Sequence, residues 1–172
     1  MTQRVELSTV MDRLAIDSVI TGYAVAVDDG NWLDYRALFT ADGRADYRTA
    51  GGIEGPAGEV AGWLAEMMRL FPVRQHFIVN RLLRLENLNG DTGDRAELQA
   101  DYLNPMRLET EPGGSSGAEP GGSSGAEQST APNFESGGRY TFSLRRTEGG
   151  WRLLAVVVEE KWRRTTGAHG AR

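Results

Sequence analysis

The chain has 172 residues, of which 40% are hydrophobic and 25% are charged, the proportions of an ordinary globular domain. It contains no cysteine, which excludes disulfide bonds, thiolate nucleophiles and zinc sites built on cysteine. A net charge of −5 argues against a nucleic-acid partner, and no stretch approaches the roughly 18 consecutive apolar residues of a membrane span. Because the N-terminal residues carry scattered charges and no apolar core, we expect no secretion signal and a cytoplasmic location.

The first half of the chain carries the periodicity of helices. Apolar residues recur at spacings of three and four between Ser8 and Asp29, and Gly30 stands where a left-handed helix end is expected. A short second helix is predicted over Trp32–Phe39, followed by a turn into a short strand. The segment EGPAGEVAGWLAEMMRLF predicts a third helix, with Pro56 near its first turn.

From residue 75 onward the pattern changes to that of strands. Long strands are predicted over four ranges that pair as two hairpins: Gln75–Glu86, Arg95–Glu109, Gly137–Arg146 and Trp151–Trp162. Helices followed by a run of strands indicate an α+β fold and not a parallel α/β fold. Several of these strands are apolar on both faces. Since three helices cover only one face of such a sheet, we expect a second subunit to cover the other.

The octapeptide EPGGSSGA occurs twice in tandem, at residues 111–118 and 119–126. It has nothing apolar to bury, so residues 111–135 are predicted to form a flexible loop between two strands. A tolerated loop expansion is the simpler interpretation, and a lid over a pocket is the other. With a disordered tail over residues 167–172, residues 1–166 are predicted to form one domain.

The predicted strand VRQHFIVN contains His76, the only histidine outside the C-terminal tail. Strand alternation places His76, Ile78 and Asn80 on one face. If that face looks toward the helices, the imidazole points into the space between helices and sheet. The simplest interpretation is a buried neutral histidine with one hydrogen bond, which is common.

Asp28 and Tyr23 lie near the end of the first predicted helix, and each has an ordinary structural explanation. Asp28 belongs to a helix-ending turn, and Tyr23 by itself is a core residue. Together with His76, however, they would support chemistry. A carboxylate bonded to one imidazole nitrogen makes the other a better base, and a phenol can hold a substrate oxygen. Such a set can remove a proton next to a carbonyl or eliminate water, but the sequence does not show that Asp28 meets His76.

Three segments together resemble the SnoaL-like family of the nuclear-transport-factor-2-like superfamily: ITGYAVAVDDGNWLDYRALFTADG, RQHFIVN and GGRYTFSLRRTEGGWRLLA. They share a Tyr-x4-Asp at the end of the first helix, a second helix that starts at Trp and ends in Leu-Phe, and a His-x3-Asn strand. The resemblance implies a cone, in which a strongly curved, barrel-like mixed sheet wraps around three N-terminal helices and encloses one pocket. It also implies a homodimer through the outer face of the sheet.

The resemblance further implies an Asp–His pair of the kind that dehydratases and a dehydrochlorinase of this superfamily use. Carried over, the aspartate falls on Asp28, the histidine on His76 and a dehydratase-type tyrosine on Tyr23, with no metal or organic cofactor. Some relatives place an arginine near the last strands. Arg139, Arg145 and Arg146 compete for that position, and Arg145 or Arg146 is favoured, with Arg146 as the catalytic candidate.

The function expected from these features is a cofactor-independent lyase or isomerase, dehydratase- or cyclase-like. His76 would be the base, Asp28 would orient it, and Tyr23 would hold an oxygen of a small, apolar and perhaps polycyclic molecule. The alternatives are a module that binds a ligand without transforming it, and a dimerisation domain whose pocket is vestigial. Further residues expected to line the pocket are Trp32, Trp63, Ile78, Asn80, Tyr102, Asn104 and Arg145.

Overall fold

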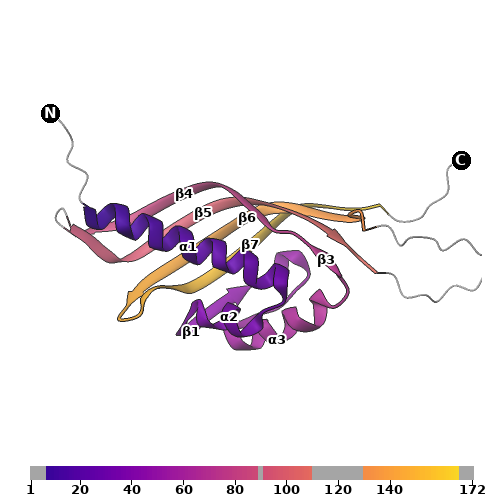
Figure 1. The fold of residues 1–172 in the computed structure, drawn as a ribbon, viewed down its shortest axis with the longest axis horizontal. Helices are drawn as coiled ribbons and strands as arrows, with labels where there is room; N and C mark the ends of the chain where they lie inside the picture. Colours follow the sequence, from indigo (N-terminus) through magenta and orange to yellow (C-terminus); the bar gives the residue numbers. More distant parts are fainter. Residues whose placement is uncertain (1–6, 89–90, 110–129, 167–172) are drawn as a thin grey trace, which may run out of the picture.

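A computed structural model of the protein describes residues 7–88, 91–109 and 130–166 (Figure 1). The helices are α1 (Leu7–Asp29), α2 (Trp32–Ala37) and α3 (Ala57–Met68), with a 3-10 turn η1 (Arg48–Ala50). The strands are β1 (Phe39–Asp46), β2 (Glu54–Pro56), β3 (Val73–Arg74), β4 (Phe77–Leu88), β5 (Asp91–Arg107), β6 (Phe134–Thr147) and β7 (Gly150–Thr165). Within these ranges, no helix has both the length and the apolar character needed to cross a membrane.

The strands form one curved sheet in the order β2-β1-β7-β6-β5-β3, and β4 also pairs with β5 (Figure 1). The sheet is mixed, because β1 runs parallel to β7 while the other neighbours are antiparallel. The α1 helix lies along the concave face, and α2 and α3 cover one end of it (Figure 1). The predicted α+β fold, with helices packed inside a curved sheet, is therefore confirmed.

The core lies between α1 and the concave face of the sheet. Ile16, Ile20 and Tyr23 of α1 are at most 1% exposed and belong to one buried cluster with β6. The Tyr23 ring meets the edges of Tyr140 and Phe142 with centroids 5.7 and 5.3 Å apart, a favourable edge-to-face geometry. This packing fixes α1 over β6 and so determines where the end of the helix falls.

The edge strand is interrupted at residues 75 and 76, where the sequence predicted one continuous strand from Gln75. Arg74 in β3 pairs with Met106, and Phe77 in β4 pairs with Leu103, so the register is the same on both sides of the gap. That register places His76 opposite Asn104, beside Pro105. In the same register Pro105, which has no N–H to donate, stands opposite Gln75.

The last strand contains a bulge that changes which side chains face inward. Trp162 pairs with Gly137, but Glu160 and not Lys161 pairs with the next residue, Gly138. One extra residue on β7 therefore opposes β6 at this point, as in a β-bulge. Beyond the bulge, Arg163 pairs with Ser136 and returns to the inner face.

The predicted loop over residues 111–135 joins β5 to β6, and its part up to residue 129 lies outside the described residues, as does the predicted tail 167–172. The two ends of this connection are tied together. The Leu108 N–H donates to Asn133 Oδ1 at 2.6 Å, and Asn133 Nδ2 donates to the Leu108 carbonyl at 2.9 Å. These bonds close the connection at its base.

The outer face of the sheet carries exposed apolar side chains in one transverse row. Phe77, Leu103 and Trp162 belong to this row and are 40–47% exposed, and the Trp162 ring lies over Gly137. Val79 extends the patch along β4, while Val157 stands apart from it, beyond Asp101, Arg139 and Glu159. A contiguous apolar patch of this kind is typical of an interaction surface.

We propose that a second copy of the chain covers this outer face. Leu103→Glu places a charge in the middle of the row and should convert a dimer to a monomer in size-exclusion chromatography with light scattering. Leu33→Glu is the matched control, since Leu33 lies on α2 and is 77% exposed. A wild-type protein that is already monomeric at micromolar concentration would contradict the proposal.

Candidate active site

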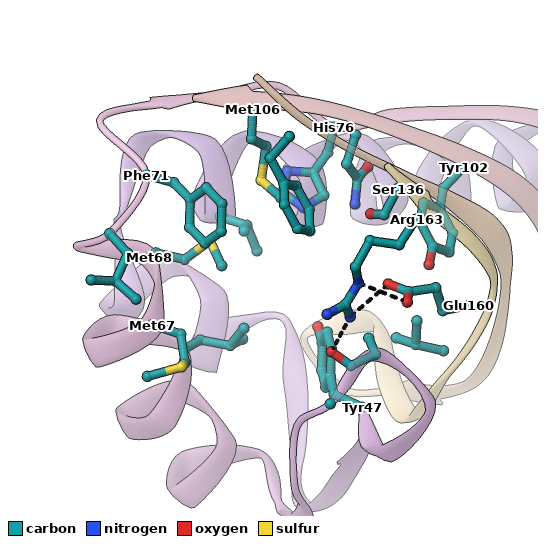
Figure 2. A pocket seen from close by; sticks show the side chains of 18 of the residues that line it. Tyr47, Met67, Met68, Phe71, His76, Tyr102, Met106, Ser136, Glu160 and Arg163 are labelled. Atoms are coloured by element: carbon teal, nitrogen blue, oxygen red, sulfur yellow. Dashed lines mark hydrogen bonds and ion pairs between the residues drawn. The ribbon is translucent and has the colours of Figure 1, made fainter. Parts of the chain in front are cut away.

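A cavity of about 270 Å³ lies between the helices and the concave face of the sheet (Figure 2). Its walls come from α1, from η1 and the residues around it, from α3 and from strands β5, β6 and β7. One side is apolar and holds Met67, Met68 and Phe71, while Glu160 and Arg163 lie across from them (Figure 2). The cavity therefore has an apolar end and a polar end.

His76 and Asp28 make a two-point contact at the edge of this cavity. The Nδ1 atom of His76 lies 2.6 Å from Asp28 Oδ1, and the His76 backbone N–H donates to Asp28 Oδ2 at 3.0 Å. The imidazole is 7% exposed and the carboxylate 22%. A carboxylate on Nδ1 keeps the proton on that nitrogen, so Nε2 carries the lone pair. No partner for Nε2 is found in the described part of the chain.

The break in the edge strand is what makes this contact available. His76 lies in the break between β3 and β4. There its N–H donates to the carboxylate at the end of α1. The same two residues thus join helix and sheet through a backbone and a side-chain bond.

Arg74 holds the helix ends around the pair. Its Nε donates to the Asp28 carbonyl at 3.0 Å, and its Nη1 donates to the Met68 carbonyl at 3.1 Å. These carbonyls belong to the last turns of α1 and α3, where backbone acceptors lack partners within the helix. Gly30 follows with φ +68°, and a Cβ there would come within 3.3 Å of Arg74 Nη2. The chain therefore needs glycine at residue 30.

A group of buried tyrosines forms the floor of the cavity. The hydroxyls of Tyr23 and Tyr47 are hydrogen-bonded to each other. Burial raises the pKa of the Tyr23 phenol well above its usual value, and burial does the same to the pKa of Tyr47. Both phenols are therefore neutral at physiological pH and act as hydrogen-bonding groups, not as bases.

Four of the polar residues that line the cavity stand in one transverse row. His76 stands opposite Asn104, Asn104 pairs with Ser136, and Ser136 pairs with Arg163. All four line the cavity. Side chains that stand opposite each other on neighbouring strands are about 5 Å apart at Cβ, so the row forms a continuous polar strip.

Arg163 ends this row in an ion pair with Glu160. Its Nε and Nη2 donate to the two carboxylate oxygens at 3.0 Å each, and Nη2 also donates to the Ala50 carbonyl at 2.8 Å. The β7 bulge makes this pair possible, because it brings residues three apart onto the same face. Arg163 also lies over the Phe134 ring, 5.5 Å from its centroid.

Comparison with known proteins identifies the family. The model of the SnoaL-like domain matches residues 8–157. The chain belongs to the SnoaL-like domain family. Its relative in Mycobacterium tuberculosis, the uncharacterized protein Rv2910c, is 32% identical over 100 residues, which cover 58% of this chain and 64% of that protein. The match thus spans less than two thirds of the relative's length.

Solved structures with the same fold include two that are named for eliminations. A hexachlorocyclohexane dehydrochlorinase (LinA) type 2 has a TM-score of 0.69 at 18% identity, and the match covers 98% of each chain. A candidate scytalone dehydratase from Novosphingobium aromaticivorans has a TM-score of 0.67 at 15% identity, covering 95% of this chain and 93% of that one. At these identities the likeness shows the fold alone, and it confirms the predicted nuclear-transport-factor-2-like cone.

Five residues that the sequence put in the site of this SnoaL-like protein line the cavity: Tyr23, Trp63, His76, Tyr102 and Asn104. Asp28 stands behind His76 and reaches the cavity through the imidazole. Within the described residues, no three His, Asp or Glu side chains lie close enough together to hold a metal ion.

The two favoured arginines do not line the cavity, which corrects the prediction. Arg145 pairs with Asp42 at 2.5 Å. Arg146 binds the Asp12 carboxylate through two nitrogens at 2.7 and 2.8 Å, beside Trp151. Asp12 is 16 residues before Asp28 on α1, about 24 Å away at 1.5 Å per residue. Arg146 therefore binds α1 near the opposite end from Asp28.

The remaining predicted residues also lie elsewhere. Arg139 faces the outer side of the sheet, where it pairs with Asp101 at 2.8 Å. Asn80 has φ 51° at an irregularity of β4, which turns its side chain outward to Asp101. Ile78 is 7% exposed in the core, and Trp32 packs edge-on against Tyr35. These residues support the fold without lining the cavity.

Several residues of the site were not predicted from the sequence. Arg74 lies two positions before His76 in the same quoted segment, and strand alternation gives the two the same face. Predicting that Ser136 lines the cavity requires the β5–β6 register, which the sequence does not provide. Predicting that Glu160 and Arg163 both face the cavity requires knowledge of the bulge, because simple alternation puts residues three apart on opposite faces.

Replacing Arg74 with alanine should destabilise the fold. It removes one donor from the Asp28 carbonyl and one from the Met68 carbonyl, which keeps the Phe71 N–H, at a cost of about 1–3 kcal/mol in the free energy of unfolding. Chemical denaturation followed by circular dichroism measures the change. Arg36→Ala, on the exposed side of α2, is the control and should change the free energy of unfolding by less than about 0.5 kcal/mol. An Arg74→Ala protein as stable as wild type would show that the two carbonyls do not need this donor.

Proposed function

We propose that this SnoaL-like protein is a cofactor-independent lyase or isomerase, of dehydratase or cyclase type, that acts on a small and mostly apolar molecule. The observation that carries the proposal is the contact of His76 Nδ1 with the Asp28 carboxylate, in an imidazole that also lines the cavity. This arrangement leaves Nε2 as a general base in a largely dry site.

In the proposed reaction, His76 Nε2 removes a proton from a carbon next to a carbonyl or next to a carbon that bears a leaving group. The C–H electrons form the new double bond, and the leaving group departs with its bonding electrons. The imidazolium then returns the proton, to a departing hydroxyl as water or to another carbon in an isomerisation. Asp28 stabilises the imidazolium while it exists.

The other lining residues support the same chemistry. The Tyr23 and Tyr47 hydroxyls are neutral hydrogen-bonding groups at the floor of the cavity, where they can hold a substrate oxygen. Such fixed dipoles act on developing charge without reorganising. The family fold agrees with this proposal, since its known members include a dehydrochlorinase. The cavity of about 270 Å³ argues against a vestigial pocket filled by aromatic side chains.

The first test needs only proton removal. Small neutral ketones such as 1-indanone are incubated with the protein in deuterated water, and deuterium uptake next to the carbonyl is followed by NMR. β-Hydroxyketones are tested in parallel for loss of water. His76→Ala should lower the rate by about 100-fold or more, as expected for the loss of a general base.

Two further variants make the test specific. Asp28→Asn should also lower the rate by about 100-fold or more, because the imidazole loses its fixed tautomer. His169→Ala removes the other histidine of the chain and should leave the rate unchanged. Near-ultraviolet circular dichroism checks that each variant is folded. A folded His76→Ala protein with full activity would exclude His76 as the base, and binding without turnover of any ketone would favour a ligand-binding module.

A further inference from the structure

Asn104 carries a buried acceptor that the fold does not use. Its side chain lines the cavity and the residue is only 5% exposed. Its Oδ1 atom has no hydrogen-bond partner among the described residues. Buried polar groups are nearly always paired, so an unpaired acceptor on a cavity wall indicates a group supplied by a ligand.

The Asn104 amide is a neighbour of the Tyr140 phenol. Burial raises the pKa of the Tyr140 phenol, and a hydrogen bond from Asn104 opposes that rise. Within the described residues, Oδ1 is the atom of this amide that is buried without a hydrogen-bond partner. The carbonyl oxygen of the amide is then the atom left for a ligand, and it accepts a hydrogen bond.

Asn104 also stands next to the proposed base. The common register of β3 and β4 on β5 places it directly opposite His76. A ligand group that donates to Oδ1 is therefore held beside the imidazole. The remote end of the same ligand can extend toward Met67, Met68 and Phe71 (Figure 2).

The charges around the cavity disfavour an anion. Among the described lining residues Arg163 is the one cationic side chain, and it is bonded to both oxygens of Glu160. The Asp28 carboxylate adds a negative charge behind His76. A carboxylate or phosphate ligand would find the one cationic side chain of the lining already paired with Glu160.

The size of the cavity limits the ligand further. An apolar cavity of about 150 Å³ holds one benzene molecule. At about 270 Å³, this cavity has room for a molecule of about two rings. The apolar wall and the methionines favour a hydrocarbon body over a sugar or a peptide.

We propose that the substrate is an uncharged molecule of about two rings, with a hydroxyl group that donates to Asn104 Oδ1. The hydroxyl sets the orientation of the molecule beside His76, and the hydrocarbon body fills the methionine end. Asn104 is thus the residue that selects hydroxylated substrates. This inference rests on the proposed function in taking the bound molecule to be the substrate.

Three bicyclic probes of matched shape test the selection: 5-indanol, 5-methoxyindane and indane-5-carboxylate. Binding is followed by NMR of protein labelled at the methionine methyl groups, where Met67, Met68 and Met106 report on the cavity. Met11, exposed near the start of α1, is the internal control. Wild-type protein should bind 5-indanol at least tenfold more tightly than 5-methoxyindane and should bind the carboxylate most weakly.

Two variants assign the selection to Asn104. Asn104→Leu should abolish the preference for the hydroxyl while binding of 5-methoxyindane persists. Gln99→Leu makes the same kind of change on β5, at a residue outside the cavity lining, and should keep the wild-type preference. Because methoxyindane binding is measured in every protein, a variant that fails to fold is recognised by its loss.

The outcomes separate this inference from the proposed function. Equal binding of the alcohol and the ether by wild type, or an unchanged preference in Asn104→Leu, overturns the role of Asn104. If the carboxylate binds most tightly, the substrate is not neutral. If none of the probes shifts a methionine signal, the proposed substrate class is wrong. Hydroxyl selection in a protein that fails to exchange or eliminate would uphold the ligand class and refute the lyase.

Discussion

The two hydrogen bonds between His76 and the Asp28 carboxylate join the end of α1 to the edge of the sheet, and the rest of the site depends on this junction. The backbone bond is made in the break between β3 and β4. The side-chain bond exists because the tyrosine and isoleucine packing of α1 carries its last turn to that interruption. Arg74 then holds the carbonyl of the same aspartate. One small set of contacts therefore determines both the closure of the cone and the tautomer of its imidazole.

Much of this fold could be predicted from the sequence. The three helices and the run of long strands followed from hydrophobic periodicity, because residues that repeat at three and four or at two must face a common core. The end of α1 was marked by Gly30, which has the expected positive φ. The candidate pair Asp28 and His76 came from residue chemistry and family resemblance together. Its geometry still required the register of β3, β4 and β5, which depends on contacts far apart in the sequence.

The arginines show where sequence reasoning reaches its limit. Arg145 and Arg146 were favoured for an arginine that some relatives place near the last strands. Each has a nearby aspartate, and those partners lie on β1 and on the first turns of α1. Arg163 reaches the cavity instead, because one extra residue in β7 reverses the alternation of the strand. A bulge leaves no reliable mark in a sequence, so the inward-facing set of a long strand is predictable only up to the first irregularity.

The two hydrogen bonds between Asn133 and Leu108 determine where the sequence can accept insertions. An asparagine side chain that both accepts from and donates to one backbone unit imitates a pair of strand residues. It ends the β5–β6 ladder at a fixed point. The length of the chain beyond that point therefore does not change the positions of Asn104 and Ser136. The tandem octapeptide could have arisen by duplication without disturbing the cavity. The same position is where a reporter domain or an affinity tag could be spliced into the chain.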